Sequence, residues 1–252
     1  MRAPISEGLA IVGLLLCFLL GSCATNEVDH CLTNRSAAEQ RWNSERSNAA
    51  WLGVEWLNEP HDKAEIADLA HDLRERRIGT IYVYASYLKP DGTFNRTYDH
   101  ASAFVQQLKT ANPDCHVQAW IGLPLTRIWL LPSLGYVSLA DTATRERIVR
   151  FATTLVHENG FDGLHLDPEP VISGDEHLLV LLAELRGRLG SDLVLSIAGR
   201  RICPFPGKVP EFLLHRLAWS SGYYRRVAVH VDEIALMTYD STLALRWTYR
   251  LW

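Results

Sequence analysis

Near its middle the chain reads Phe161-Asp162-Gly163-Leu164-His165-Leu166-Asp167-Pro168-Glu169. Residues two apart in a β-strand point to the same side, so His165, Asp167 and Glu169 share one face. Three ionisable side chains in line on a buried strand cost free energy unless they are used. Pro168 indicates that the strand ends here, because proline cannot donate a hydrogen bond to a central ladder. The stretch therefore predicts a buried strand that carries a polar site at its carboxyl end.

Strand-like and helix-like segments alternate on both sides of this strand. The hydrophobic pattern predicts strands over residues 51–56, 80–85, 115–121, 161–167, 193–198 and 234–238, and helices over 62–77, 101–109, 142–158 and 177–189. Asp141 is predicted to cap the start of the third helix, and Gly160 to close it. Strict alternation of this kind implies parallel strands joined by right-handed crossovers.

Two α/β architectures fit this order, an open doubly wound sheet and a closed barrel. No glycine-rich phosphate loop follows the first strand, which argues against a dinucleotide-binding open sheet. Acidic and aromatic residues gather at the carboxyl ends of several strands, where barrel enzymes place their chemistry. We therefore expect a (β/α)8 TIM-type barrel over residues 51–252. Only six strands are predicted by Asp240, so we expect the barrel to be truncated after strand six, with an incomplete barrel or one closed by a partner as the alternatives.

The composition is that of an ordinary globular protein. Of 252 residues, 48% are hydrophobic and 21% are charged, and the formal net charge is −4. No run of like charges forms a basic patch, so we expect no nucleic-acid partner. The histidines show no metal-ligand spacing, and we expect neither a metal ion nor a cofactor.

The first residues resemble a bacterial lipoprotein leader. An apolar run, Leu9–Leu20, is shorter than the about 20 residues that a membrane-spanning helix needs. It is followed by Leu20-Gly21-Ser22-Cys23, which resembles a lipobox, where cleavage precedes a cysteine that is then acylated. We expect a signal peptide over 1–22, a lipid anchor at Cys23 that holds the protein in the cell envelope outside the cytoplasm, and a polar tether over 23–50. An ordinary signal peptide and a buried apolar helix are the alternatives.

Three cysteines remain outside the leader and the lipidation site, namely Cys31, Cys115 and Cys203. An odd number allows at most one disulfide within the chain, and the spacing leaves its pairing open.

The segment around Asp167 resembles the signature of glycoside hydrolase family 18, the chitinase-like family, in which a strand reads Asp-Gly-x-Asp-x-Asp-x-Glu. The matching residues are Asp162, Gly163, Asp167 and Glu169. Further along, Met237-Thr238-Tyr239-Asp240 resembles the Met-x-Tyr-Asp motif of the same family. The resemblance covers residues 51–240 and implies a TIM barrel that hydrolyses an N-acetylhexosamine-containing polysaccharide or oligosaccharide.

The resemblance also implies roles for single residues. Glu169 is the general acid and base, and the substrate's own 2-acetamido oxygen is the nucleophile, so no protein nucleophile is needed. Asp167 orients the acetamido group and stabilises the charge that develops there, and Tyr239 donates a hydrogen bond to the same group. The expected sugar-binding residues are Asp240, His165, Asp162, Trp120 and Tyr84.

His165 departs from the family pattern, which has an aspartate at this position. The histidine would become a cationic or a neutral partner of Asp167, or the site would be inactive. An inactive site would make the chain a carbohydrate-binding or scaffold lipoprotein. A third hypothesis is a metal-dependent hydrolase that uses His165, Asp167 and Glu169 as ligands, although neighbours that alternate along one strand rarely converge on one ion.

Overall fold

The computed structural model describes residues 48–125, 137–201 and 218–237. The strands are β1 (Asn48–Leu52), β2 (Ile78–Tyr87), β3 (His116–Pro124), β4 (Gly163–Glu169), β5 (Val194–Gly199) and β6 (Glu233–Leu236). The helices are α4 (Glu55–Asn58), α5 (Lys63–Glu75), α6 (Ala101–Ala111), α7 (Thr142–Asn159), α8 (Glu176–Leu189) and α10 (Ser221–Ala228).

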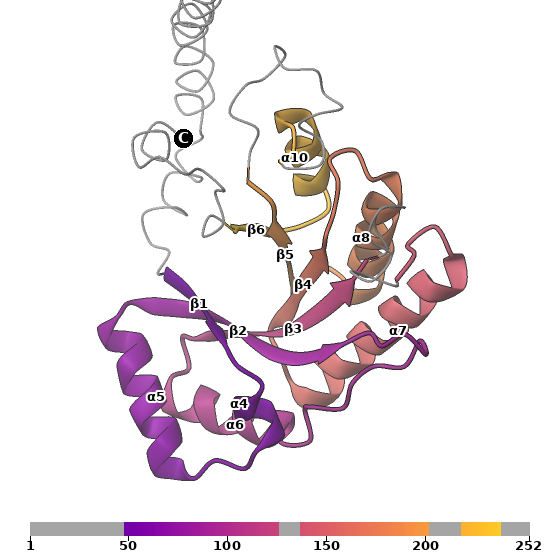
Figure 1. The fold of residues 1–252 in the computed structure, drawn as a ribbon. Helices are drawn as coiled ribbons and strands as arrows, with labels where there is room; N and C mark the ends of the chain where they lie inside the picture. Colours follow the sequence, from indigo (N-terminus) through magenta and orange to yellow (C-terminus); the bar gives the residue numbers. More distant parts are fainter. Residues whose placement is uncertain (1–47, 126–136, 202–217, 238–252) are drawn as a thin grey trace, which may run out of the picture. The chain divides into compact units, whose positions relative to one another are not determined.

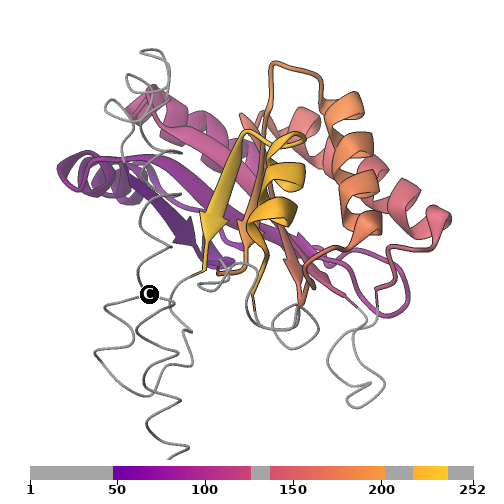
Figure 2. The same ribbon diagram turned by 90° about the horizontal axis from the view of Figure 1, so that it is seen from above.

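The strands form one six-stranded sheet in the order β1-β2-β3-β4-β5-β6. Every neighbouring pair is parallel. The sheet curls, and the helices that follow the strands pack against its outer face (Figures 1 and 2). A doubly wound sheet carries helices on both faces, whereas a TIM barrel carries them only outside. The described residues therefore contain six strands of a TIM-type barrel, as predicted.

The outer face of the sheet is apolar because alternate residues of each strand meet the helices. Leu164 and Leu166 of β4 are both 0% exposed, and Leu195 and Ile197 of β5 are equally buried beside them. Burial of a leucine side chain contributes roughly 1.5–3 kcal/mol, so this layer supplies much of the stability of the fold. The residues between them point to the inner face, where the site lies.

The helix boundaries follow their capping residues. Asp141 accepts hydrogen bonds from the backbone N–H groups of Ala143 and Thr144, which confirms it as the N-cap of α7. Gly160 ends this helix with φ 72°, a left-handed conformation that glycine adopts without a steric penalty. Asp62 and Glu65 form a capping box at the start of α5.

The first strand lies earlier in the sequence than predicted. It spans Asn48–Leu52 and pairs with β2 up to Leu52 and Val83, whereas Glu55 and Trp56 belong to helix α4. Trp56 stacks on His61 with ring centroids 4.5 Å apart, which places it outside the sheet. The prediction followed the aromatic content of residues 51–56, but the pairing with β2 decides the register.

The described residues include no helix that is both long enough and apolar enough to cross a membrane. Cys115 is buried and not in a disulfide, and burial raises the pKa of its thiol to about 11. Cys23, Cys31 and Cys203 lie outside the described residues, as do Tyr239 and Asp240.

Candidate active site

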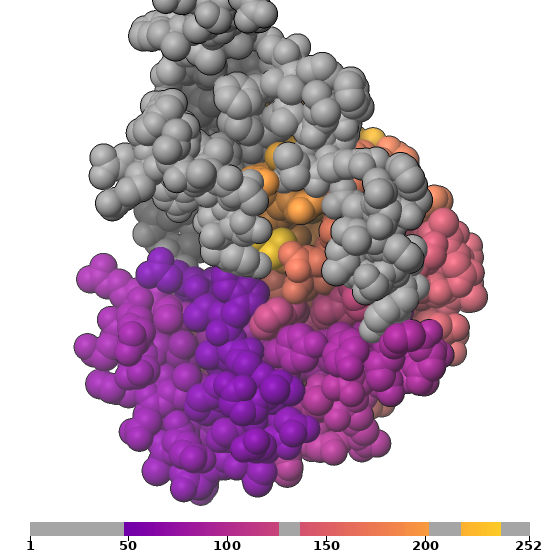
Figure 3. All heavy atoms as spheres, viewed as in Figure 1, coloured from indigo at the N-terminus to yellow at the C-terminus, as the bar shows by residue number. Residues whose placement is uncertain are grey.

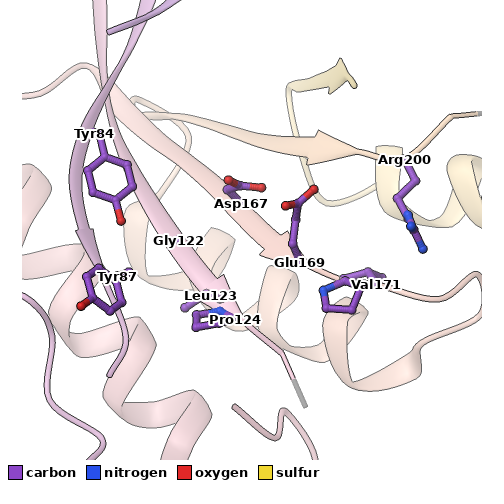
Figure 4. Close-up of a pocket in the computed structure, with 10 residues that line it drawn as sticks. Tyr84, Tyr87, Gly122, Leu123, Pro124, Asp167, Glu169, Val171 and Arg200 are labelled. Carbon is purple, nitrogen blue, oxygen red and sulfur yellow. The ribbon is translucent and has the colours of Figure 1, made fainter. Parts of the chain in front are cut away.

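The inner face of β4 carries the three ionisable residues that the sequence places in line. His165 is fully buried, Asp167 is half-buried and Glu169 is exposed, so the strand runs from the core to the mouth of the barrel. Asp167 and Glu169 lie on the same side of β4, at its carboxyl end (Figure 4).

His165 is held by hydrogen bonds on both ring nitrogens. The indole N–H of Trp51 donates to Nε2 over 3.3 Å, and Nδ1 lies 2.7 Å from the hydroxyl oxygen of Ser196. Because Nε2 accepts, Nδ1 carries the proton and donates to Ser196. Ser196 in turn donates to Oε1 of Gln118 over 2.6 Å. Burial lowers the pKa of His165 to about 3, so the ring is neutral at neutral pH.

The same hydrogen-bond chain reaches the remaining strands. Glu233 accepts from the amide of Gln118 over 3.3 Å and from the hydroxyl of Tyr82 over 3.4 Å. Tyr82 also stacks on His165, with ring centroids 3.9 Å apart. The six-strand network therefore takes one residue from each strand: Trp51, Tyr82, Gln118, His165, Ser196 and Glu233.

This network corrects the expectation that His165 binds the sugar. The ring is 0% exposed and fully engaged with protein partners, so it lies beneath the site instead of lining it. Both ring nitrogens contact Trp51 and Ser196 instead of Asp167, and burial lowers the pKa of the ring, which argues against a cationic partner for Asp167. A metal-ligand role would break the network, and the described residues contain no group of three or more side chains that could hold a metal ion.

Within the described part of the chain, Asp167 is oriented by one side-chain donor. The indole N–H of Trp120 donates to its Oδ2 over 3.1 Å, whereas its buried Oδ1 has no hydrogen-bond partner among the described residues. Burial and the neighbouring charge of Glu169 raise the pKa of Asp167 to about 6, and the bond from Trp120 opposes this rise. An oriented carboxylate with one free oxygen can accept a hydrogen bond from a ligand.

A cavity of about 660 Å³ opens in front of these carboxylates. Its lining consists of Tyr84, Tyr87, Gly122, Leu123, Pro124, Asp167, Glu169, Pro170, Val171 and Arg200 (Figure 4). Atoms of the β5 and β6 region, orange and yellow, lie at the centre of the face that carries the strand ends (Figure 3).

Space for the cavity comes from a small residue on β3. Gly122 pairs with Asp167 across β3 and β4, and a Cβ at this glycine would lie 3.4 Å from the Cβ of Tyr87 and 3.9 Å from the Tyr84 hydroxyl. A larger side chain there would fill the space between the tyrosines and the carboxylate. Gly122 therefore keeps the front of Asp167 open.

Four of the predicted site residues come together here. Tyr84, Asp167 and Glu169 line the cavity, and Trp120 joins them through its bond to Asp167 and an edge-to-face contact with Tyr84 at 4.8 Å. Gly122 and Arg200 were missed by the sequence analysis. Counting inner-face positions in steps of two from Trp120 and Ser196 would have found both.

The structure does not bring Asp162 to the cavity. This residue precedes β4 at the opposite end from Glu169, and its carboxylate forms an ion pair with Lys109 of α6. Its second oxygen accepts from the backbone N–H of Val117 over 2.9 Å. The expectation that Asp162 binds sugar is thus corrected: the residue links α6 and β3 to β4 at the base of the barrel.

Replacing Asp167 by asparagine is expected to stabilise the protein at neutral pH. The folded-state pKa of about 6 exceeds that of a carboxyl in an unfolded chain, so stability falls as the pH rises from about 4 to about 6. Asparagine can still accept the Trp120 bond but carries no charge, so the free energy of unfolding at pH 7 should rise by on the order of 1–3 kcal/mol. Urea unfolding of both proteins at pH 4 and pH 7 checks this, and an equal gain at both pH values would contradict it.

The parallel sheet curls and carries its helices on the outer face, as in a TIM-type barrel. Two carboxylates lie at the carboxyl end of one strand, so the molecule is a TIM-type barrel with a carboxylate site. The fold is that of the glycoside hydrolase family 18 chitinases. The chitinase of Cycas revoluta in complex with (GlcNAc)3 matches with a TM-score of 0.53 and 19% identity, over 77% of this chain and 55% of that one.

Two further structures give the same fold. A group IV chitinase of Ostrinia furnacalis matches with a TM-score of 0.52 and 19% identity, over 78% of this chain and 52% of that one. The spore cortex-lytic enzyme SleL of Bacillus cereus matches with a TM-score of 0.53 and 15% identity, over 77% of this chain and 42% of that one. The chain thus spans about half the length of the structures it resembles. No protein-family model and no curated protein sequence matches it.

Proposed function

We propose that this protein is a glycoside hydrolase that cleaves an N-acetylhexosamine-containing polysaccharide, with Glu169 as the general acid. The observation that carries the proposal is the pair Asp167 and Glu169, side by side on the inner face of β4 and lining one cavity. Two carboxyl groups with different surroundings can divide acid and electrostatic roles between them. Its fold, shared with family 18 chitinases, supports the same reaction class.

In the first step one carboxyl group donates a proton and the other stabilises positive charge. Glu169 donates its proton to the glycosidic oxygen as the bond from that oxygen to the anomeric carbon breaks. The 2-acetamido oxygen of the same sugar forms a new bond to the anomeric carbon. Asp167, fixed by Trp120, accepts the acetamido N–H on its free Oδ1 and stabilises the positive charge that develops on this group.

In the second step the ionised Glu169 takes a proton from water, whose oxygen adds to the anomeric carbon and displaces the acetamido oxygen. The configuration at that carbon is retained because it is inverted twice. Tyr84 and Tyr87 line the β2 side of the cavity, where aromatic rings can stack on the sugar. In this proposal Tyr239 and Asp240 complete the acetamido and sugar contacts.

Dependence on the acetamido group tests the proposal. The protein should hydrolyse the tetramer of N-acetylglucosamine and leave the tetramer of glucosamine intact, because only the former supplies the nucleophile. Chromatography of both digests measures this. Equal hydrolysis of both tetramers would refute the substrate-assisted mechanism, and binding of the acetylated tetramer without hydrolysis would favour the non-catalytic carbohydrate-binding alternative.

We further propose that the protein is anchored in the cell envelope through an acyl chain on Cys23. The support is the sequence Leu20-Gly21-Ser22-Cys23 directly after an apolar run. Expression of Cys23→Ser in a bacterial host should move the protein from the membrane to the soluble fraction. Cys17→Ser, within the apolar run, is the matched control and should stay in the membrane. Membrane association of Cys23→Ser equal to that of the wild type would contradict the anchor.

A further inference from the structure

The indole of Trp120 reaches Asp167 from the neighbouring strand and from one layer beneath it. Trp120 pairs with His165 across β3 and β4, and Gly122, two residues further along β3, pairs with Asp167. The position directly opposite Asp167 therefore carries no side chain, and the hydrogen bond to its Oδ2 comes from the diagonal neighbour over 3.1 Å. Trp120 itself does not line the cavity. It contacts the carboxylate from behind and leaves the front of Asp167 open.

The ring of Trp120 is restrained from its other side by Tyr84 of β2. The two residues pair across β2 and β3, and their rings meet edge to face with centroids 4.8 Å apart. Such contacts are favourable in a narrow range of ring orientations, so this one restrains the indole. Three neighbouring strands thus form one row on the inner face, in which Tyr84 supports Trp120 and Trp120 holds Asp167.

The Trp120 donor favours one protonation state of Asp167. An indole N–H can donate a hydrogen bond but cannot accept one, so it stabilises the carboxylate more than the protonated acid. Burial and, after it, the charge of Glu169 raise the pKa of Asp167, whereas the bond from Trp120 lowers it. The other titratable or charged side chains around Asp167 in the described part of the chain line the cavity or lie beneath it, namely Tyr84, Tyr87, Arg200, His165 and Glu233.

The same bond decides which carboxylate oxygen is left for a ligand. The last torsion angle of an aspartate side chain is broad, and a hydrogen bond to Oδ2 restricts its rotation. Oδ1 of Asp167 is buried and has no hydrogen-bond partner among the described residues. A buried acceptor without a partner costs free energy, which a donor from a bound ligand would recover.

We propose that Trp120 is a positioning residue whose N–H keeps Asp167 ionised and turned so that its Oδ1 accepts the acetamido N–H of the ligand. This role differs from that of a sugar platform, for which the indole face would have to lie in the cavity. The ligand half of the inference rests on the proposed function, whereas the effect of Trp120 on Asp167 is a property of the protein alone. The two halves are measured separately.

The first measurement follows the carboxyl carbon of Asp167 by NMR as the pH is varied, without ligand. Trp120→Phe keeps an aromatic ring beside Tyr84 but has no N–H, so it should raise the pKa of Asp167 by about one pH unit or more. Replacement of Trp120 by 3-benzothienylalanine, in which sulfur takes the place of the N–H group, keeps the shape of the indole. It should give the same rise even if the phenylalanine variant does not fold.

Trp56→Phe is the matched control, because Trp56 stacks on His61 outside the sheet. It should leave the pKa of Asp167 unchanged. A pKa of Asp167 that stays at the wild-type value in the variants of Trp120 would overturn the proposal.

Titration calorimetry with the tetramer of N-acetylglucosamine tests the ligand half. Glu169→Gln is the parent protein, because it slows turnover and removes the charge of Glu169 from the comparison. The affinity should fall as the pH drops through the pKa of Asp167, since protonation replaces the acceptor by an O–H donor. Addition of Trp120→Phe should move this fall upward by about one pH unit.

A fall in affinity at the same pH with and without Trp120→Phe would overturn the ligand half, as would an affinity that does not change with pH. The outcome for hydrolysis is separate. If the wild type hydrolyses no glycan but the pKa of Asp167 still depends on Trp120, the glycosidase proposal fails while the positioning role of Trp120 stands.

Discussion

Replacing Glu169 by glutamine is expected to lower kcat/KM for the N-acetylglucosamine tetramer by about 10²- to 10⁴-fold, the usual contribution of a general acid. Glutamine keeps the shape of the side chain at the end of β4 but has no acidic proton to give to the glycosidic oxygen. The tetramer should still bind, because the aromatic and Asp167 contacts remain, so the loss should appear in kcat and not in KM.

Steady-state release of new reducing ends measures this change. Glu158→Gln is a matched control, since Glu158 is an exposed glutamate in α7 and lies outside the cavity. It should turn over the tetramer at the rate of the wild type. Turnover by Glu169→Gln at the wild-type rate would remove Glu169 from the mechanism.

The second large effect is on stability. Replacing His165 by alanine is expected to lower the free energy of unfolding by about 3–5 kcal/mol, through a buried cavity and lost hydrogen bonds. The ring fills the space beside Tyr82, and its nitrogens satisfy Trp51 and Ser196. Without it, the Ser196 hydroxyl and the Trp51 indole each lose a partner inside the sheet.

Urea unfolding at neutral pH checks the size of this effect. His71→Ala is the control, because His71 is exposed on α5 and its loss should change stability by less than about 0.5 kcal/mol. A variant of His165 as stable as the control would show that the six-strand network does not hold the sheet together.

Local pattern was sufficient to predict the order of strands and helices and the placement of Asp167 and Glu169 together at one strand end. The two-residue period of a strand places His165, Asp167 and Glu169 on one face, and the leucines between them on the other. The capping roles of Asp141 and Gly160 follow from local chemistry in the same way. Alternation of strands and helices then orders the sheet.

What the sequence could not reveal depends on contacts between distant segments. Burial lowers the pKa of His165, and the ring contacts Trp51, Ser196 and Tyr82, which come from three other strands. Asp162 is engaged by Lys109, a residue of α6 that only the fold brings near. The cavity at Arg200 likewise requires β4 and β5 to lie side by side.

His165 stands where the family 18 signature has an aspartate, and this difference changes the charge beneath Asp167. Burial and, after it, the charge of Glu169 raise the pKa of Asp167, whereas the neutral ring of His165 beneath it contributes no charge. Asp167 is therefore the carboxyl group of the cavity whose pKa is raised. If the proposed hydrolysis takes place, its pH dependence should report the titration of Asp167.

The most direct test of the central claim is the configuration of the first product. Proton NMR during hydrolysis of the β-linked N-acetylglucosamine tetramer by the wild-type protein resolves the anomers of the new reducing end before they interconvert. A retaining, substrate-assisted reaction at Asp167 and Glu169 predicts that the β-anomer forms first. Initial formation of the α-anomer, or no product after prolonged incubation, would contradict the account.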